Sequence, residues 1–224
     1  MLFGGGKLKR VFLLAVVVLL SAFFIREYVQ ASPKKQARTS EQSQIQELPE
    51  IIVGSPDAPV TIIEYSSLTC GHCAIFHTEV LPKLHKKFIK TGRVRILVRD
   101  FPLDPIALRG SQIAWGRGAK HYIETLETIF EEQEEWLYNS EDMVSSLDKV
   151  ARTCGLTQAD VDRCTNDLTL MNGILKKRLD GNNTYTISGT PTFIINGKEH
   201  TGALSEASFV KAIIEAEKAE KANS

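Results

Sequence analysis

Two cysteines separated by two residues, Cys70 and Cys73, stand in a chain of 224 residues that has only four cysteines. Such a pair can bind a metal, brace the chain as a disulfide, or exchange disulfides with another molecule. Zinc would need further ligands at close spacing, but the other two cysteines have nine residues between them, so we expect no metal. A Cys70–Cys73 bridge closes too small a loop to stabilise the fold much. Exchange chemistry is therefore the favoured interpretation.

The chain around this pair predicts a strand followed by a helix. Residues 60–65 are rich in β-branched side chains, and apolar residues recur with helical spacing from 70 to about 90, although Pro82 should kink that helix. With Thr69 as N-cap, the unpaired amides and the dipole at the helix start would lower the pKa of Cys70. His72 could add a positive charge or a hydrogen bond. Cys73, one turn further in, would be shielded and could resolve a mixed disulfide.

A second signal lies far away in the sequence. The segment Ser-Gly-Thr-Pro-Thr at 188–192 places Pro191 directly before a strand. A cis bond is possible there, and the missing amide hydrogen leaves the backbone of Thr190 free to face a ligand. Thr-Pro alone is a common turn, but together with the strand, the cysteine pair and the helix it supports a thiol site.

The remaining pattern predicts an α/β fold with an all-helical insertion. A second strand is expected at 93–99, helices at 105–118, 122–136, 141–154 and 158–179, a hairpin at 192–201 and a last helix at 205–218. Without the helical block, the order of elements suits a mixed sheet with helices on both faces. The acidic run at 131–135 is interpreted as the solvated face of a helix.

The amino terminus is predicted to be an export segment. Lys7, Lys9 and Arg10 precede the uncharged residues 11–25. Residues 1–31 could be a signal cleaved after Ala31 or a retained membrane anchor, and residues 32–49 resemble a flexible linker. Export would place the cysteines where disulfides persist. The 27 basic and 27 acidic side chains balance, so nucleic acid is not expected as a partner.

Three stretches together resemble the DsbA-like thiol:disulfide oxidoreductases of the bacterial periplasm. They are GSPDAPVTIIEYSSLTCGHCAIFH at 54–77, RDFPLDPIAL at 99–108 and SGTPTFIINGKEHTGA at 188–203. The resemblance implies a thioredoxin-like domain at 50–102 and 188–224, with a helical insertion domain at 103–187. It implies that Cys70 is the nucleophile, that Cys73 is its buried partner, and that Thr190 and Pro191 form a cis-proline loop that helps to hold substrate.

The resemblance also suggests which residues set the redox properties of the site and which partners the protein has. Glu64 falls where the family has an acidic group that influences proton transfer, although it could instead be a strand residue that faces solvent. Gly71 replaces the proline of the best-known members, and Cys-Gly-His-Cys is also the motif of disulfide isomerases, so oxidase, isomerase and reductase activities stay open. No lysine clearly matches the one that some members pair with the acid. The implied partners are unfolded exported proteins with free thiols and a membrane quinone-linked reoxidase, with no cofactor beyond the redox-active disulfide.

The other two cysteines are expected to form a structural disulfide. A Cys154–Cys164 disulfide would join two short helices, the first of which ends at Gly155. Such a disulfide is the default in an oxidising compartment. A second redox pair is the alternative. A different class of function also stays open, in which the chain is an envelope-anchored binding protein with a vestigial cysteine pair.

Overall fold

The computed structural model describes residues 47–223. The predicted export segment, its cleavage point at Ala31 and almost all of the predicted linker lie outside the described residues. Leu48, assigned from the sequence to the linker, is buried in the core, so the folded body begins before the predicted limit at residue 49. Within the described part of the chain, no helix is both long enough and apolar enough to cross a membrane.

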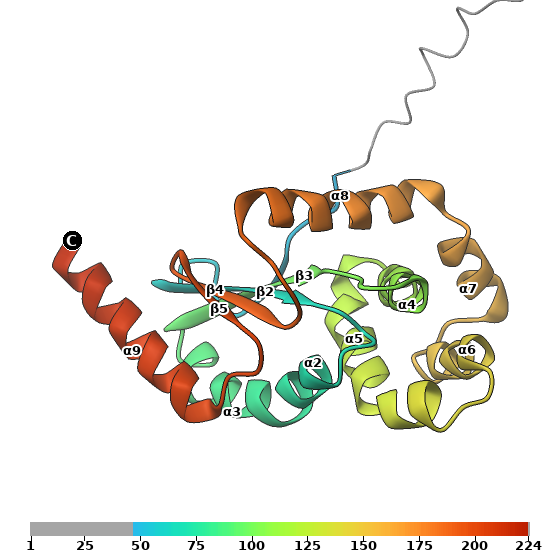
Figure 1. Cartoon of the computed structure of the whole chain (residues 1–224), viewed down its shortest axis with the longest axis horizontal. Coiled ribbons are helices and arrows are strands. Elements are labelled where there is room, and N and C mark those ends of the chain that lie inside the picture. The colour runs from blue at the N-terminus through green and yellow to red at the C-terminus, as the bar shows by residue number, and fades with distance from the viewer. Residues whose placement is uncertain (1–46, 224) are drawn as a thin grey trace, which may run out of the picture. The chain divides into compact units, whose positions relative to one another are not determined.

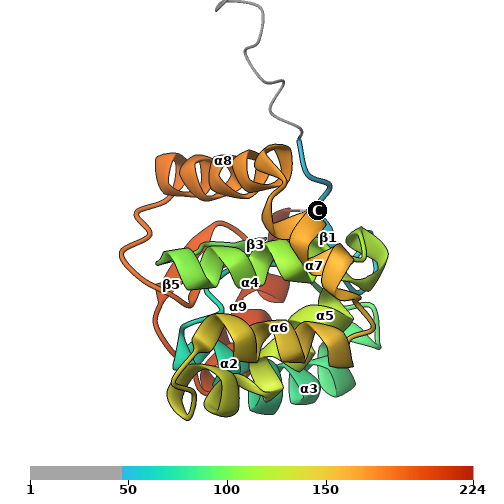
Figure 2. The ribbon, with the colours of Figure 1, turned by 90° about the vertical axis from the view of Figure 1, so that its right-hand side faces the viewer.

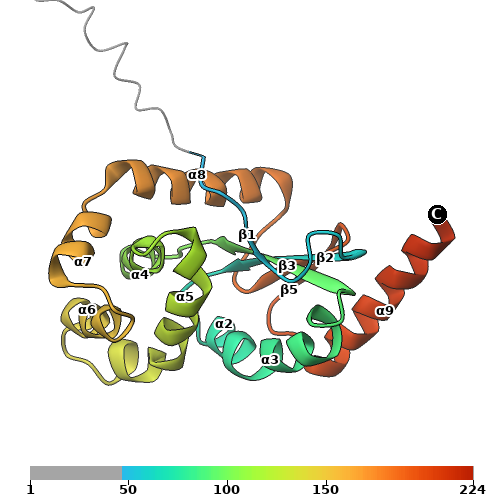
Figure 3. The ribbon, with the colours of Figure 1, turned by 180° about the vertical axis from the view of Figure 1, so that it is seen from behind.

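A five-stranded mixed sheet forms the centre of this body (Figure 1). The strands are β1 (Ile51–Val53), β2 (Val60–Ser66), β3 (Val94–Asp100), β4 (Thr192–Ile195) and β5 (Lys198–Thr201). Their order is β1-β3-β2-β4-β5, with β2 and β3 parallel and all other pairs antiparallel. The sequence pattern missed the short edge strand β1, which lies beside β3 (Figure 3).

The position of β2 in the sheet explains its composition. No residue of β2 is exposed, because strands flank it on both sides and helices cover both faces (Figure 1). Only β3 is parallel to it, and a parallel pair needs a crossover connection. The helical segment that begins after Cys70 supplies this crossover. The carboxyl end of β2 therefore leads straight to the cysteine pair.

The crossover runs without a break from Gly71 to Ile89. It consists of α2 (Gly71–Ile75), a π-helical segment (Phe76–Val80), α3 (Leu81–Leu84) and a second π-helical segment (His85–Ile89). The effect of Pro82 appears as a π-helical stretch before it, where the Leu81 amide donates to the Phe76 carbonyl. Pro82 has no amide hydrogen to continue the regular ladder.

Helices alone fill the chain between β3 and β4. They are α4 (Pro105–Trp115), a short 3-10 turn (Ala119–His121), α5 (Tyr122–Glu131), a π-helical segment (Glu134–Tyr138), α6 (Met143–Thr153), α7 (Gln158–Thr165) and α8 (Leu168–Thr184). Helix α4 contacts α5, α6, α7 and α8 and is the centre of the block (Figure 2). The single helix predicted at 158–179 is two helices, because the Asp167 carboxylate caps α8 by accepting from the amides of Thr169 and Leu170.

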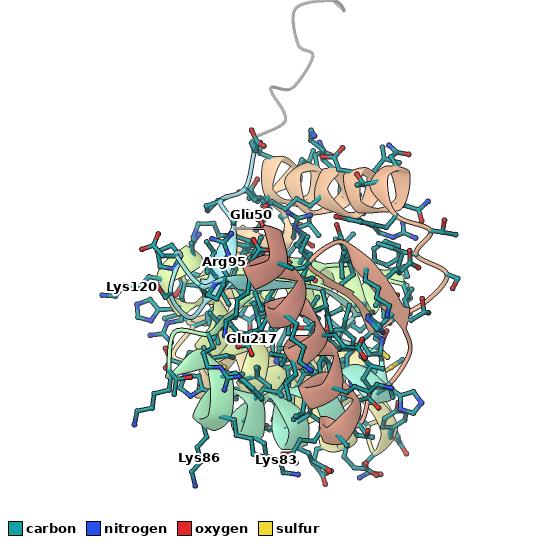
Figure 4. All side chains as sticks on the ribbon, turned by 90° about the vertical axis from the view of Figure 1, so that its left-hand side faces the viewer. Glu50, Lys83, Lys86, Arg95, Lys120 and Glu217 are labelled. Atoms are coloured by element: carbon teal, nitrogen blue, oxygen red, sulfur yellow. The ribbon has the colours of Figure 1, made fainter. Side chains whose placement is uncertain are left out.

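Two helical layers enclose the sheet. Helix α8 covers one face, while α2, α3 and α9 (Glu206–Asn223) lie on the other (Figure 1). Arg93 fixes α9 by donating two hydrogen bonds of 2.7 Å to Glu217. On this side of the molecule Lys86 and Lys120 project outward (Figure 4). The described residues 47–223 all belong to one compact unit, and the predicted division into two domains stays a prediction.

Candidate active site

Cys70 lies in the turn between the end of β2 and the start of α2. It is the N-cap residue of α2, and its carbonyl accepts from the amides of Cys73 and Ala74. The prediction that Thr69 caps this helix is wrong. Its hydroxyl is turned away and donates to the Asp104 carboxylate at 2.5 Å. That bond ties the active-site turn to the start of α4.

The two sulfurs of the pair have opposite properties. Cys70 is partly exposed and Cys73 is fully buried. The pKa of Cys70 is lowered from 9.0 to about 5, chiefly by a hydrogen bond from the Cys73 thiol, with smaller lowering contributions from the Thr190 side chain and from the backbone of Cys73 and His72. The pKa of Cys73 is raised well above its ordinary value, chiefly by burial and by the neighbouring Cys70. Cys70 therefore has the lowered pKa that a nucleophilic thiol needs, and backbone groups at the helix start are among the causes.

The loop before β4 faces the same sulfur. The Thr190–Pro191 peptide bond is cis, and the Cys70 Sγ lies 3.2 Å from the Thr190 carbonyl oxygen. These residues are 120 positions apart in the chain, and the antiparallel pairing of β4 with β2 brings them together. Pro191 has no amide hydrogen to donate, and its carbonyl accepts from the Gly202 amide at 2.8 Å.

Glu64 lies inside the protein, beneath the cysteine pair. Its side chain has no solvent exposure, so the alternative of a strand residue that faces solvent is wrong. The Glu64 Oε1 lies 3.0 Å from the His77 Nε2, and the charge of Glu64 is among the causes that raise the pKa of Cys73. The His77 ring is stacked on Phe130. Its pairing with Glu64 was not predicted.

The residues between the cysteines line the outer side of the pair. The His72 side chain is exposed, and its backbone amide is among the groups that lower the pKa of Cys70. A methyl group added at Gly71 would meet the Tyr138 hydroxyl at 3.6 Å, an ordinary contact. A larger residue would therefore fit at position 71, and lack of space does not explain the glycine there.

Gln133 is a site residue that the sequence did not reveal. Its amide nitrogen donates to the Leu68 carbonyl at 2.7 Å and to the Cys70 carbonyl at 3.3 Å. The acidic run around it was interpreted as a solvated face, and Glu131, Glu134 and Glu135 are indeed exposed, yet Gln133 is buried. The one sequence signal that could have pointed to Gln133 is that it is an uncharged residue within an acidic run. It fixes the helical block to the active-site turn.

The structure differs from the predicted Cys154–Cys164 disulfide. Both residues are free, buried thiols. The Cys164 Sγ donates to the Val161 carbonyl at 3.3 Å within α7, while the Thr128 and Thr153 side chains lie against the Cys154 sulfur. Burial raises the pKa of both thiols, and the alternative of a second redox pair stays a prediction. Among the described residues, no cluster of His, Cys, Asp and Glu could hold a metal ion.

Comparison with known proteins agrees with this geometry. The model of the thioredoxin family matches residues 46–215. The chain belongs to the thioredoxin family. A crystal structure of Wolbachia pipientis alpha-DsbA1, with 29% sequence identity, superposes with a TM-score of 0.70 over 79% of this chain and 96% of that one. This match confirms the predicted fold, a thioredoxin-like mixed sheet with an all-helical insertion.

Two further thioredoxin-family relatives carry informative names. A Rickettsia felis protein named as a protein-disulfide oxidoreductase is 27% identical over 77% of this chain and 63% of its own length. Disulfide bond formation protein D of Bacillus subtilis is 25% identical over 66% of this chain and 68% of its own length. The chain spans less than two thirds of the Rickettsia relatives that it matches. The resemblance to DsbA-like proteins is confirmed by these relatives and by the alpha-DsbA1 fold.

Proposed function

We propose that this protein is a thiol:disulfide oxidoreductase that introduces disulfides into exported proteins through Cys70 and Cys73. The observation that carries the proposal is the contrast between the two sulfurs. One is partly exposed with a pKa lowered to about 5, and the other is buried with a raised pKa. The names of the relatives agree with this chemistry.

The reaction needs no group beyond the protein's own disulfide. A client thiolate attacks the exposed sulfur of Cys70 in the oxidised protein, the Cys70–Cys73 bond breaks, and Cys73 leaves and takes up a proton. A second client thiolate then attacks the client sulfur of the mixed disulfide. Cys70 leaves as a thiolate, the client gains one disulfide, and the protein holds the two electrons as a dithiol.

The low pKa of Cys70 favours net oxidation over isomerisation. A stabilised thiolate makes the reduced protein more stable, so its disulfide is a stronger oxidant. It also makes Cys70 the better leaving group in the second step. An isomerase or reductase on the same fold would need to rest in the reduced state in the cell, and alkylation of thiols in acid-lysed cells reads that state.

The cellular setting forms part of the proposal. Residues 1–31 would direct the chain to the periplasm, either as a cleaved signal or with residues 11–25 as a membrane anchor. A quinone-linked membrane protein would reoxidise the Cys70–Cys73 dithiol. These assignments rest on the basic start and apolar run of the sequence and on the resemblance to DsbA-like proteins.

A trapping variant tests the activity. In Cys73→Ala the Cys70 thiolate can still attack a client disulfide, the reverse of the second step, but no Cys73 thiol remains to release Cys70, so mixed disulfides between Cys70 and client proteins should accumulate and disappear on reduction. Cys70→Ala is the matched control, because it keeps one cysteine of the pair but removes the nucleophile. Failure of Cys73→Ala to trap any client, with a Cys70 pKa near that of a free thiol, would instead favour the non-catalytic binding protein.

A further inference from the structure

A hollow of about 460 Å³ opens beside the cis-proline loop. Three segments line it: the loop after β3, one side of α8, and the residues before Thr190. Its lining includes Phe101, Leu103, Arg178, Leu179, Ser188 and Gly189. We call it the α8 groove. None of these residues takes part in the disulfide exchange described above.

The groove begins next to the reacting sulfur. Gly189 directly precedes Thr190, whose carbonyl oxygen lies 3.2 Å from the Cys70 Sγ. On the opposite wall, the Leu103 amide donates to the Ser67 hydroxyl at 3.3 Å, which fixes that wall to the active-site turn. A client joined to Cys70 that runs along the loop backbone in this direction therefore enters the groove.

The close approach of α8 to the sheet builds the groove. A methyl group at Gly181 would lie 2.4 Å from the Tyr65 Cε1, so only glycine allows this contact. Tyr65 packs edge-on against Phe101 with ring centroids 6.1 Å apart, and both belong to a small buried cluster with Ile187. The groove wall is thus anchored in the core and is already formed without a client.

The groove combines apolar and cationic chemistry. Leu103 is 50% exposed and Leu179 58% exposed, so both offer apolar surface to a ligand in the groove. Arg178 lines the groove, and its guanidinium lies over the Phe101 ring at 5.0 Å from its centroid. A planar guanidinium fits a carboxylate, with which it can form two parallel hydrogen bonds.

We propose that the α8 groove selects clients, binding an extended segment beside the reacting cysteine that carries an apolar side chain and a carboxylate. The apolar side chain packs against Leu103 and Leu179, and the carboxylate binds Arg178. This inference rests on the proposed oxidase function. A compact hollow of this volume is about 8 Å across, which two or three extended residues span at about 3.3 Å each. The two side chains therefore lie within about three residues of the client cysteine.

Reduced peptides with two cysteines provide the test. One set carries Leu and Glu at the second and third positions after the first cysteine, and another carries them before it. Matched peptides replace Glu by Lys or Leu by Ser. With the oxidised wild-type protein at low salt, the Leu-Glu peptide should react about tenfold faster than the Leu-Lys peptide in one of the two sets, and the ratio should fall as salt is added. Replacing Leu by Ser should also slow the reaction.

Two variants assign the preference to the groove. Arg178→Gln should bring the Glu-to-Lys rate ratio close to one. Lys176→Gln is the control, because it removes a positive charge from the same helix at an exposed position paired with Asp180, outside the groove. It should keep the ratio of the wild type. Comparing rates between peptides within one variant cancels any loss of correctly folded protein.

The outcomes separate the two proposals. Equal rates for all peptides in both sets, or an unchanged ratio in Arg178→Gln, would overturn the role of the α8 groove and leave the oxidase function standing. If the wild type oxidised none of the peptides, both proposals would fall.

Discussion

The His77 Nε2 lies 3.0 Å from the Glu64 Oε1, and neither side chain is exposed to solvent. The other polar atoms of this pair, the His77 Nδ1 and the Glu64 Oε2, are also buried and have no hydrogen-bond partner. The pair joins the crossover helix to β2 directly beneath the active site. The charge of Glu64 is among the causes that raise the pKa of Cys73, so the pair influences how readily Cys73 holds a proton.

Glu64→Gln should lower the pKa of Cys73 from its value in the native protein. The carboxylate raises this pKa by its negative charge, whereas an amide of the same shape does not. Burial still dominates, so the pKa should stay above that of a free thiol. Titration of the Cys73 Cβ by carbon NMR in the reduced protein measures the change. Glu79→Gln, at an exposed position of the crossover helix that carries Cys73, should leave this pKa unaltered.

His77→Ala should destabilise the protein by about 3–5 kcal/mol, the range found when one partner of a buried pair is removed. The loss leaves the Glu64 carboxylate buried without its partner and removes the ring stacked on Phe130. Urea unfolding measures it. His85→Ala, which alters an exposed histidine of the same helix, should change stability by less than about 0.5 kcal/mol. Equal losses in both variants would contradict the role assigned to the pair.

The reduced protein should become more stable relative to the oxidised protein as pH rises from about 5 toward 9. In this window the unfolded Cys70 thiol, with its ordinary pKa of 9.0, holds a proton that the folded thiolate has already lost. The unfolded state therefore binds more protons, and stability rises with pH. The gain is lost as pH falls through about 5. Urea midpoints of both forms at pH 5.5 and 8 measure the effect. Cys70→Ser has no disulfide to compare, but its midpoint should lack the rise with pH that the reduced wild type shows.

Gly181→Ala should destabilise the protein by about 1–3 kcal/mol, although alanine is the better helix former. Its methyl group would clash with the buried Tyr65 ring, so α8 would have to move away from the sheet. Thermal unfolding provides the measurement. Asn183→Ala, at an exposed position of α8, introduces alanine without a clash and should not destabilise. A Gly181→Ala protein as stable as the wild type would show that α8 can move away from the Tyr65 ring without a loss of stability.

Much of the site could be predicted because local patterns encode it. The β-branched run of β2, the helical spacing after Cys70 and the Asn196–Gly197 turn are each properties of a few consecutive residues. The two strands of the hairpin, β4 and β5, were found within such patterns, whereas β1, only three residues long, carries too little signal. The split of the helix at 158–179 was missed because Asp167 reads as one polar residue among several.

The sequence by itself determined that a thiol pair stands at the start of a helix, with one cysteine a turn deeper than the other. The tertiary structure alone decided which polar groups meet them. Thr190 is 120 residues from Cys70, and His77 is 13 residues from Glu64. Periodicity tells which side of an element is buried, but sheet pairing and helix packing choose the partner across the core. The same reason explains why Gln133 and Arg178 gave no signal in the sequence.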